Sequence, residues 1–129
     1  MFKYIIFIQV VERLYLYIQH CENESCVRDE VAVLLKGRKE VPFDICGYRL
    51  RADVVADGEA YEVKLDAEPY DGIGQAIALK AAGYKPHLVH VLKKRADLFE
   101  LYVNFLKELR LDFCTHVIAV DGRYWGLCP

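Results

Sequence analysis

The residues with the clearest chemical potential lie in one predicted β-hairpin. Polar and apolar residues alternate on both sides of Asp57-Gly58, a dipeptide typical of a two-residue hairpin turn. A turn at this point places Asp53 directly opposite Glu62, with their Cβ atoms about 5 Å apart. Lys64 follows two residues after Glu62 and therefore points to the same face of the sheet. The hairpin thus gathers two carboxylates and one ammonium group.

Two opposed carboxylates suggest a bound cation, because like charges directly across a strand pair are destabilising. Hard divalent cations such as Mg²⁺ prefer carboxylate, carbonyl and water oxygens. Asp53, Glu62 and the Val63 carbonyl are the candidate ligands, and Mn²⁺ is expected to substitute for Mg²⁺. The ion would activate a bound water and offset charge on a phosphorane-like transition state. Lys64 would orient or deprotonate that water or neutralise developing charge. This chemistry suits phosphodiester hydrolysis.

A simpler interpretation is a half-exposed hairpin whose charged face meets water. The apolar face carries Leu50, Ala52, Val54, Tyr61, Val63 and Leu65, and the charged face carries Arg49, Arg51, Asp53, Glu62, Lys64 and Asp66. Glu-x-Lys alone is uninformative, since ten Glu and nine Lys in 129 residues give about 0.7 chance occurrences. Opposed acids beside Lys64 would destabilise a hairpin face that only meets water. They favour the functional interpretation.

Helices and strands are expected to alternate along most of the chain. The patterns predict helices at residues 2–19, 26–37, 73–83 and 96–110, and strands at 41–46, 48–56, 59–66, 87–92 and 114–120. For residues 2–19, a strand is the alternative. A turn at Asp121-Gly122 leads to a short tail at 124–127. This order predicts an α/β fold with a mixed central β-sheet flanked by helices, formed by one domain over residues 1–129.

Composition and charge set limits on partners. A net charge of −2 gives no general attraction to nucleic acid, so such binding must use local basic runs such as 36–39, 49–51 and 93–95. The most apolar run, residues 4–11, is too short to span a bilayer, and no small-residue cleavage site follows it. We expect a cytoplasmic protein without a membrane partner.

The cysteines and histidines give weaker signals. The five cysteines are Cys21, Cys26, Cys46, Cys114 and Cys128, an odd number that leaves at least one unpaired within a monomer. None shows Cys-x-x-Cys spacing. A metal cluster formed by His20, Cys21 and Cys26 is the less favoured interpretation. His87 and His90 are expected on opposite faces of their strand, in core or surface roles.

The order of these residues resembles the PD-(D/E)XK nuclease superfamily, which includes restriction endonucleases, archaeal Holliday-junction resolvases and RecB-like nucleases. The resemblance covers about residues 26–92 and implies a restriction-endonuclease-like core of helix, three strands, helix and strand. The residues that carry it are Glu30, Asp53, Glu62-Val63-Lys64 and Gln75. By resemblance, Asp53 and Glu62 are metal ligands and Lys64 is the catalytic lysine. Glu30 is then an additional helix carboxylate, and Gln75 matches the glutamine of the second helix.

Two positions depart from the family pattern. Ala52 precedes Asp53 where Pro is common, and Leu79 stands where the RecB-like Gln-x-x-x-Tyr pattern has Tyr. The resemblance implies a Mg²⁺-dependent nuclease acting on DNA, on branched or single-stranded structures, as a homodimer. The aromatic-rich 2–18 segment offers a dimer surface, with core packing as the alternative. The rival functions are a non-catalytic nucleic-acid-binding or assembly module that keeps the nuclease fold, and a small-molecule metallohydrolase.

Overall fold

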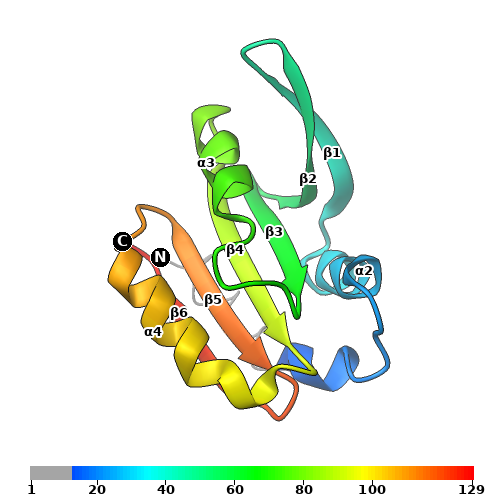
Figure 1. Cartoon of the computed structure of the whole chain (residues 1–129). Helices are drawn as coiled ribbons and strands as arrows, with labels where there is room; N and C mark the ends of the chain where they lie inside the picture. The colour runs from blue at the N-terminus through cyan, green and yellow to red at the C-terminus, as the bar shows by residue number, and fades with distance from the viewer. Residues whose placement is uncertain (1–12) are drawn as a thin grey trace.

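The computed structural model describes residues 13–129, and the strands in this range form one six-stranded mixed sheet in the order β1-β2-β3-β4-β5-β6 (Figure 1). The strands are β1 Arg38–Ile45, β2 Tyr48–Ala56, β3 Glu59–Leu65, β4 Lys85–Leu92, β5 Cys114–Ala119 and β6 Tyr124–Leu127. β3, β4 and β5 are parallel to one another, while β1, β2 and β6 extend the sheet with antiparallel pairings. The predicted α/β fold with a mixed sheet is confirmed.

Helices cover both faces of this sheet. They are α2 Glu24–Leu35, α3 Ile73–Ala81 and α4 Phe99–Leu109, with the 3₁₀ turn η1 Ala96–Leu98 before α4 and a helical stretch at residues 13–17. On one face, α2 and the 13–17 helix pack against apolar side chains of the central strands, such as Val63 and Val89. On the other face, α3 packs on β3 and β4, and α4 packs on β5. No helix in the described range is long and apolar enough to cross a bilayer.

The predicted hairpin turn is confirmed. Asp57 and Gly58 both have positive φ, 52° and 78°, the geometry of the turn that matches the twist of antiparallel strands. The register is as predicted for Ala56 opposite Glu59, Val55 opposite Ala60 and Val54 opposite Tyr61. The predicted cross-strand pair of Asp53 with Glu62 does not form, because the β2–β3 ladder ends at Val54 and Tyr61. A similar turn at Cys46-Gly47 joins β1 to β2, and that hairpin extends beyond the rest of the sheet in Figure 1.

Several element ends differ from the prediction. α2 begins two residues early, because Asn23 caps it by accepting a hydrogen bond from the Cys26 N–H through its side chain. β1 begins at Arg38 and β4 at Lys85, since sheet pairing extends both strands beyond their apolar cores. The helix predicted at 96–110 is a 3₁₀ turn followed by α4. Of the helix predicted at 2–19, residues 13–17 are helical and residues 1–12 lie outside the described range.

A chain of buried polar groups crosses the sheet from β3 to β6. Glu59 Oε1 lies 2.7 Å from His87 Nε2, His87 Nδ1 lies 2.9 Å from His116 Nε2, and His116 Nδ1 lies 2.9 Å from the Tyr124 hydroxyl. These four residues come from β3, β4, β5 and β6. Burial lowers the pKa of His116 well below its usual range, so this imidazole is neutral. Of the core and surface roles expected for His87, the structure shows the core role.

Candidate active site

The site forms where β2 and β3 separate. Their ladder extends to Val54 opposite Tyr61, and beyond it the Asp53 carboxylate accepts a hydrogen bond from the Val63 N–H at 2.8 Å. The N–H and C=O of one strand residue point to the same neighbour. The Val63 carbonyl therefore faces the side on which Asp53 lies. A carboxylate oxygen and a backbone carbonyl of the predicted ligand set are thus brought together.

A second carboxylate reaches the same edge of β3 from the first residue of α2. Glu24 Oε1 accepts a hydrogen bond from the Leu65 N–H at 3.2 Å, two residues beyond the N–H that Asp53 binds. Sequence analysis assigned the helix carboxylate to Glu30. In the structure, Glu30 faces His20 instead, with 3.8 Å between its Oε1 and His20 Nε2. The signal for Glu24 is the Asn23 cap, which starts the helix early and puts a carboxylate in its first turn.

Glu62 is the most deeply buried acid of the predicted set, with only 4% of its surface exposed. Burial, together with the negative charge of Asp53, raises the pKa of Glu62 to about 8, against a smaller opposing effect of the Lys64 ammonium. Asp53 is thus close enough to oppose the ionisation of Glu62. The two acids interact although the ladder ends before them, so they are not the directly opposed pair that the turn predicted.

Lys64 lies on the same face of β3 as Glu62, under the start of α3. Gly72, with φ of 89°, precedes α3, and a Cβ atom there would lie 3.3 Å from Lys64 Cε and 2.5 Å from a Leu88 methyl carbon. Only glycine allows so close an approach with this backbone conformation. The loop before α3 therefore packs directly on the aliphatic part of the lysine.

His90 is the neighbour of Lys64 across the β3–β4 pairing, and sequence analysis did not place it at the site. Its burial is the main cause that lowers its pKa to about 4, and Lys64 lowers it further. The imidazole is thus neutral, with Nε2 3.0 Å from the Asp71 carbonyl oxygen, to which it donates. Its Nδ1 is buried without a hydrogen-bond partner among residues 13–129. His90 therefore packs beside Lys64 without adding a second positive charge.

Gln75 lies in the first turn of α3, on the side of the sheet that carries Glu62 and Lys64, and its side chain is exposed. Four residues later, Leu79 is fully buried in a cluster with Ala52 and Ala60. The position at which the RecB-like pattern has Tyr is thus part of the hydrophobic core in this chain.

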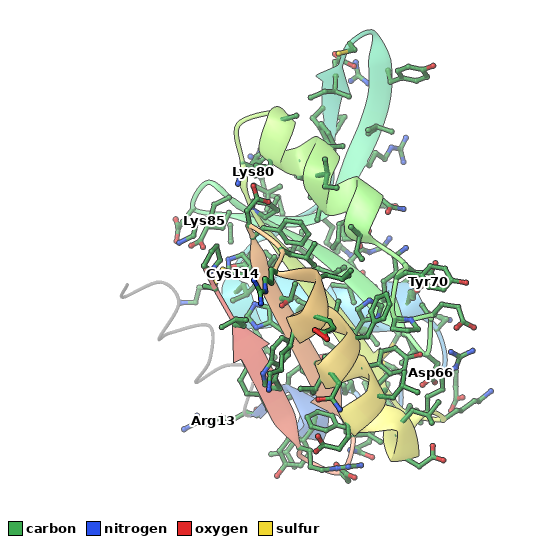
Figure 2. The ribbon with its side chains drawn as sticks, turned by 60° about the vertical axis from the view of Figure 1, so that its left-hand side comes forward. Arg13, Asp66, Tyr70, Lys80, Lys85 and Cys114 are labelled. Carbon is green, nitrogen blue, oxygen red and sulfur yellow. A yellow bond between two sulfur atoms is a disulfide. The ribbon has the colours of Figure 1, made fainter. Side chains whose placement is uncertain are left out.

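Hydrogen bonds join the residue after β3 to the loop that follows β4. Asp66, labelled in Figure 2, accepts three backbone hydrogen bonds, from the N–H groups of Lys93, Lys94 and Arg95, at 2.8 to 3.0 Å. The Arg95 guanidinium also pairs with Glu68 at 3.0 Å. Lys93 also has partners inside the protein, because its ammonium donates hydrogen bonds to the carbonyl oxygens of residues 19 and 21. Two members of the basic run 93–95 are therefore paired. Residues 93–95 therefore hold the end of β3 in place, and they contribute little to a free basic surface.

The donor atoms suit a hard divalent cation. Asp53 uses one oxygen for the Val63 N–H, which leaves its second oxygen, the Val63 carbonyl and the Glu62 carboxyl as oxygen donors. Mg²⁺ commonly keeps several waters and takes few protein ligands, so a small donor set is sufficient. A cation between the acids would also relieve the repulsion that raises the Glu62 pKa.

Comparisons of the chain with models of known families, with curated proteins and with solved structures found no match.

Proposed function

We propose that this chain is a Mg²⁺-dependent nuclease of the PD-(D/E)XK type that hydrolyses phosphodiester bonds of DNA. The observation that carries the proposal is the convergence of Asp53, Glu62 and the Val63 backbone at the break between β2 and β3, with Lys64 on the face of Glu62. The order α2-β1-β2-β3-α3-β4 supports it, since it is the core order that the family resemblance implies.

Each residue has a distinct role in this proposal. Asp53 and Glu62 would hold the ion together with the Val63 carbonyl, and Glu24 takes the place of Glu30 as the helix carboxylate beside them. The bound Mg²⁺ would supply an activated water and offset charge on the phosphate. Lys64 would bind a phosphate oxygen or orient the attacking water, with its stem held by the Gly72 loop. Gln75, at the start of α3, would contact the substrate from the solvent side.

The surface that would bind the DNA backbone is the β1–β2 hairpin. A shallow pocket on this hairpin is lined by Lys39, Glu40, Pro42, Arg49 and Arg51. Arg51 precedes Asp53 by two residues on β2, so this basic surface leads toward the break between β2 and β3. Phosphate contacts of this kind make affinity fall with increasing salt.

The experiment is cleavage of duplex, single-stranded and branched DNA with Mg²⁺ or Mn²⁺. We expect Asp53→Ala, Glu62→Ala and Lys64→Ala each to reduce the rate by about 100-fold or more, because each removes a ligand or a charge at the reacting phosphate. Glu108→Ala is the control, since Glu108 is an exposed acid on α4, outside the proposed DNA-binding hairpin. A wild-type protein that cuts none of the substrates, or an Asp53→Ala variant with full activity, refutes the proposal.

The second candidate is a non-catalytic nucleic-acid-binding or assembly module with the same fold. The basic pocket of the β1–β2 hairpin favours it, because phosphate binding there needs no metal. Titration calorimetry with Mg²⁺ separates the candidates: a nuclease shows binding that Asp53→Ala removes, whereas the module shows none.

As a nuclease resembling junction resolvases the chain would be a homodimer, and Leu16 and Tyr17, exposed on the 13–17 helix, are candidates for that surface. Light scattering tests the dimer.

A further inference from the structure

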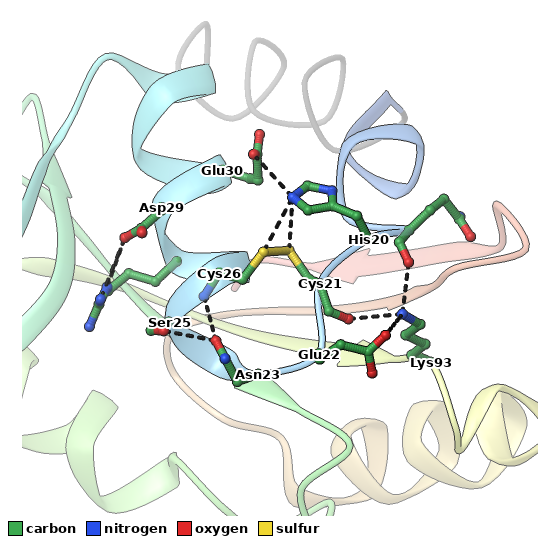
Figure 3. The surroundings of a disulfide bond; sticks show 11 residues. His20, Cys21, Glu22, Asn23, Ser25, Cys26, Asp29, Glu30 and Lys93 are labelled. Atoms are coloured by element: carbon green, nitrogen blue, oxygen red, sulfur yellow. Dashed lines mark hydrogen bonds and ion pairs between the residues drawn. A yellow bond between two sulfur atoms is a disulfide. The ribbon is translucent and has the colours of Figure 1, made fainter.

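A second group of metal-ligating side chains lies where the segment before α2 meets that helix, which also carries Glu24 (Figure 3). Cys21 and Cys26 are joined by a disulfide there. His20 Nε2 lies 3.5 Å from Cys26 Sγ, 3.9 Å from Cys21 Sγ and 3.8 Å from Glu30 Oε1. One imidazole nitrogen is thus placed between two sulfur atoms and a carboxylate oxygen, as Figure 3 shows.

We propose that, after reduction of the Cys21–Cys26 disulfide, His20, Cys21, Cys26 and Glu30 bind one Zn²⁺ ion. Structural zinc sites are tetrahedral, with Zn–S of about 2.3 Å and Zn–N or Zn–O of about 2.0 to 2.2 Å. These bond lengths correspond to ligand–ligand separations of roughly 3.3 to 3.8 Å. The distances from His20 Nε2 to the sulfur and carboxylate atoms are already close to this range. His20, Cys21 and Cys26 already have ligand atoms within 4.8 Å of one another, so the two sulfur atoms must move apart and the Glu30 carboxylate must turn toward them.

The backbone around the cluster holds the ligands in place. Cys26 and Glu30 are one turn apart on α2 and share a helix face. The Lys93 ammonium donates hydrogen bonds to the Gln19 and Cys21 carbonyl oxygens, at 2.7 and 2.9 Å, which fixes the segment that carries the other two ligands. The site therefore needs little rearrangement of the main chain.

The cluster also meets the chemical requirements of a thiolate–zinc site. Cys26 lies in the first turn of α2, where the Asn23 side chain accepts a hydrogen bond from its N–H and holds its backbone in place. The His20 side chain is 66% exposed and Cys26 is partly exposed, so an ion can reach the imidazole and a reductant can reach the Cys26 sulfur. Cys21 is buried, which shields one Zn–S bond from solvent.

The two states of the cluster are linked by a balanced reaction. A dithiol reductant supplies two electrons and two protons, so that the protein disulfide becomes two thiols and the dithiol becomes a disulfide. A phosphine reductant supplies two electrons and becomes its oxide, and water supplies the oxygen and the two protons. Binding of Zn²⁺ to both thiolates then releases the two thiol protons. The same residues would cross-link α2 to the preceding segment under oxidising conditions and join them through a metal under reducing conditions.

The test uses the whole chain, reduced with a phosphine that is then removed without oxygen, and titrated with Co²⁺ as a spectroscopic probe. We expect one equivalent to give the d–d bands of a tetrahedral site and a thiolate-to-cobalt charge-transfer band, both lost when Zn²⁺ is added. The oxidised protein should give neither. Cys21→Ser should abolish the charge-transfer signal of the two-thiolate site, and His20→Ala and Glu30→Gln should each weaken Co²⁺ binding about tenfold or more.

Two variants act as matched controls. Cys46→Ser removes the exposed free thiol, and the Cys114→Ser/Cys128→Ser double variant removes the other disulfide of the described range. Both should keep the full signal. A reduced wild type without the charge-transfer band overturns the proposal. An unchanged affinity of His20→Ala for Co²⁺ also overturns it, because this exposed side chain can be removed without loss of folding. Co²⁺ at the all-oxygen Asp53 site gives no thiolate band, so the result does not depend on the proposed nuclease.

Discussion

Replacement of Glu62 by Gln tests the electrostatics of the proposed nuclease site most directly. A carboxyl with a raised pKa in the folded protein binds its proton more tightly there than in the unfolded chain. The wild type should therefore lose stability as pH rises from about 4.5, the ordinary value, through about 8, the value in the fold. Glu62→Gln keeps the shape of the protonated acid and cannot ionise. Its stability should depend much less on pH in this window.

The size of the effect follows from the shift. A change in pKa from 4.5 to about 8 corresponds to at most about 5 kcal/mol between pH 4 and pH 9. Side-chain relaxation and water entry lower this figure, so we expect the wild type to lose about 2 to 4 kcal/mol across the window relative to Glu62→Gln. Mg²⁺ should restore stability to the wild type at pH 9, because an ion that binds the folded state stabilises it.

The assay is urea unfolding at pH 5, 7 and 9, with a chelator or with Mg²⁺, followed by the fluorescence of Trp125, the one tryptophan in the sequence. Glu108→Gln is the control, since Glu108 is an exposed acid on α4. Its pH dependence should match that of the wild type. Parallel curves for the wild type and Glu62→Gln refute the argument that Asp53 and burial oppose ionisation of Glu62. Equal stabilisation of both proteins by Mg²⁺ refutes the assignment of Glu62 as a ligand.

Three further changes test the packing around the site and should be measured by the same unfolding assay. Gly72→Ala should lower stability by about 2 kcal/mol or more, because the new Cβ meets a leucine of β4 at 2.5 Å in a backbone conformation with φ of 89°; an unchanged midpoint would show that the loop adapts. His87→Ala should cost about 3 to 5 kcal/mol, since it leaves Glu59 buried without the imidazole, and a loss below 1 kcal/mol would contradict this. Asn23→Ala should cost about 1 kcal/mol through loss of the α2 cap, whereas Asn23→Asp should keep it.

The sequence was sufficient to predict the hairpin because its turn is encoded locally. Asp57-Gly58 accepts positive φ at both positions, and the two-residue loop then determines every cross-strand pair up to Val54 and Tyr61. The order of helices and strands was predictable for a similar reason, because apolar periodicity identifies each element by itself. The register of the parallel strands has no such local signal.

The residues that sequence analysis misplaced or missed depend on contacts between distant segments. Glu30 was preferred because it precedes the apolar half of its helix, but helix phase turns it toward His20 while Glu24 reaches β3. The contact of His90 with Lys64 depends on how β4 lies beside β3, which periodicity does not specify. The chain from Glu59 through His87 likewise needs the register of four strands.

The break between β2 and β3 explains why the two acids of the motif behave differently. Where the strands separate, the Val63 and Leu65 N–H groups lose backbone acceptors, and buried donors without partners are costly. Carboxylates of Asp53 and Glu24 take the place of those acceptors. Asp53 is therefore held in position by the fold before any ion binds, whereas Glu62 is buried beside it in a setting that opposes its charge. In the proposed metal site, the break in the ladder would thus position Asp53, and a bound cation would favour the ionised form of Glu62.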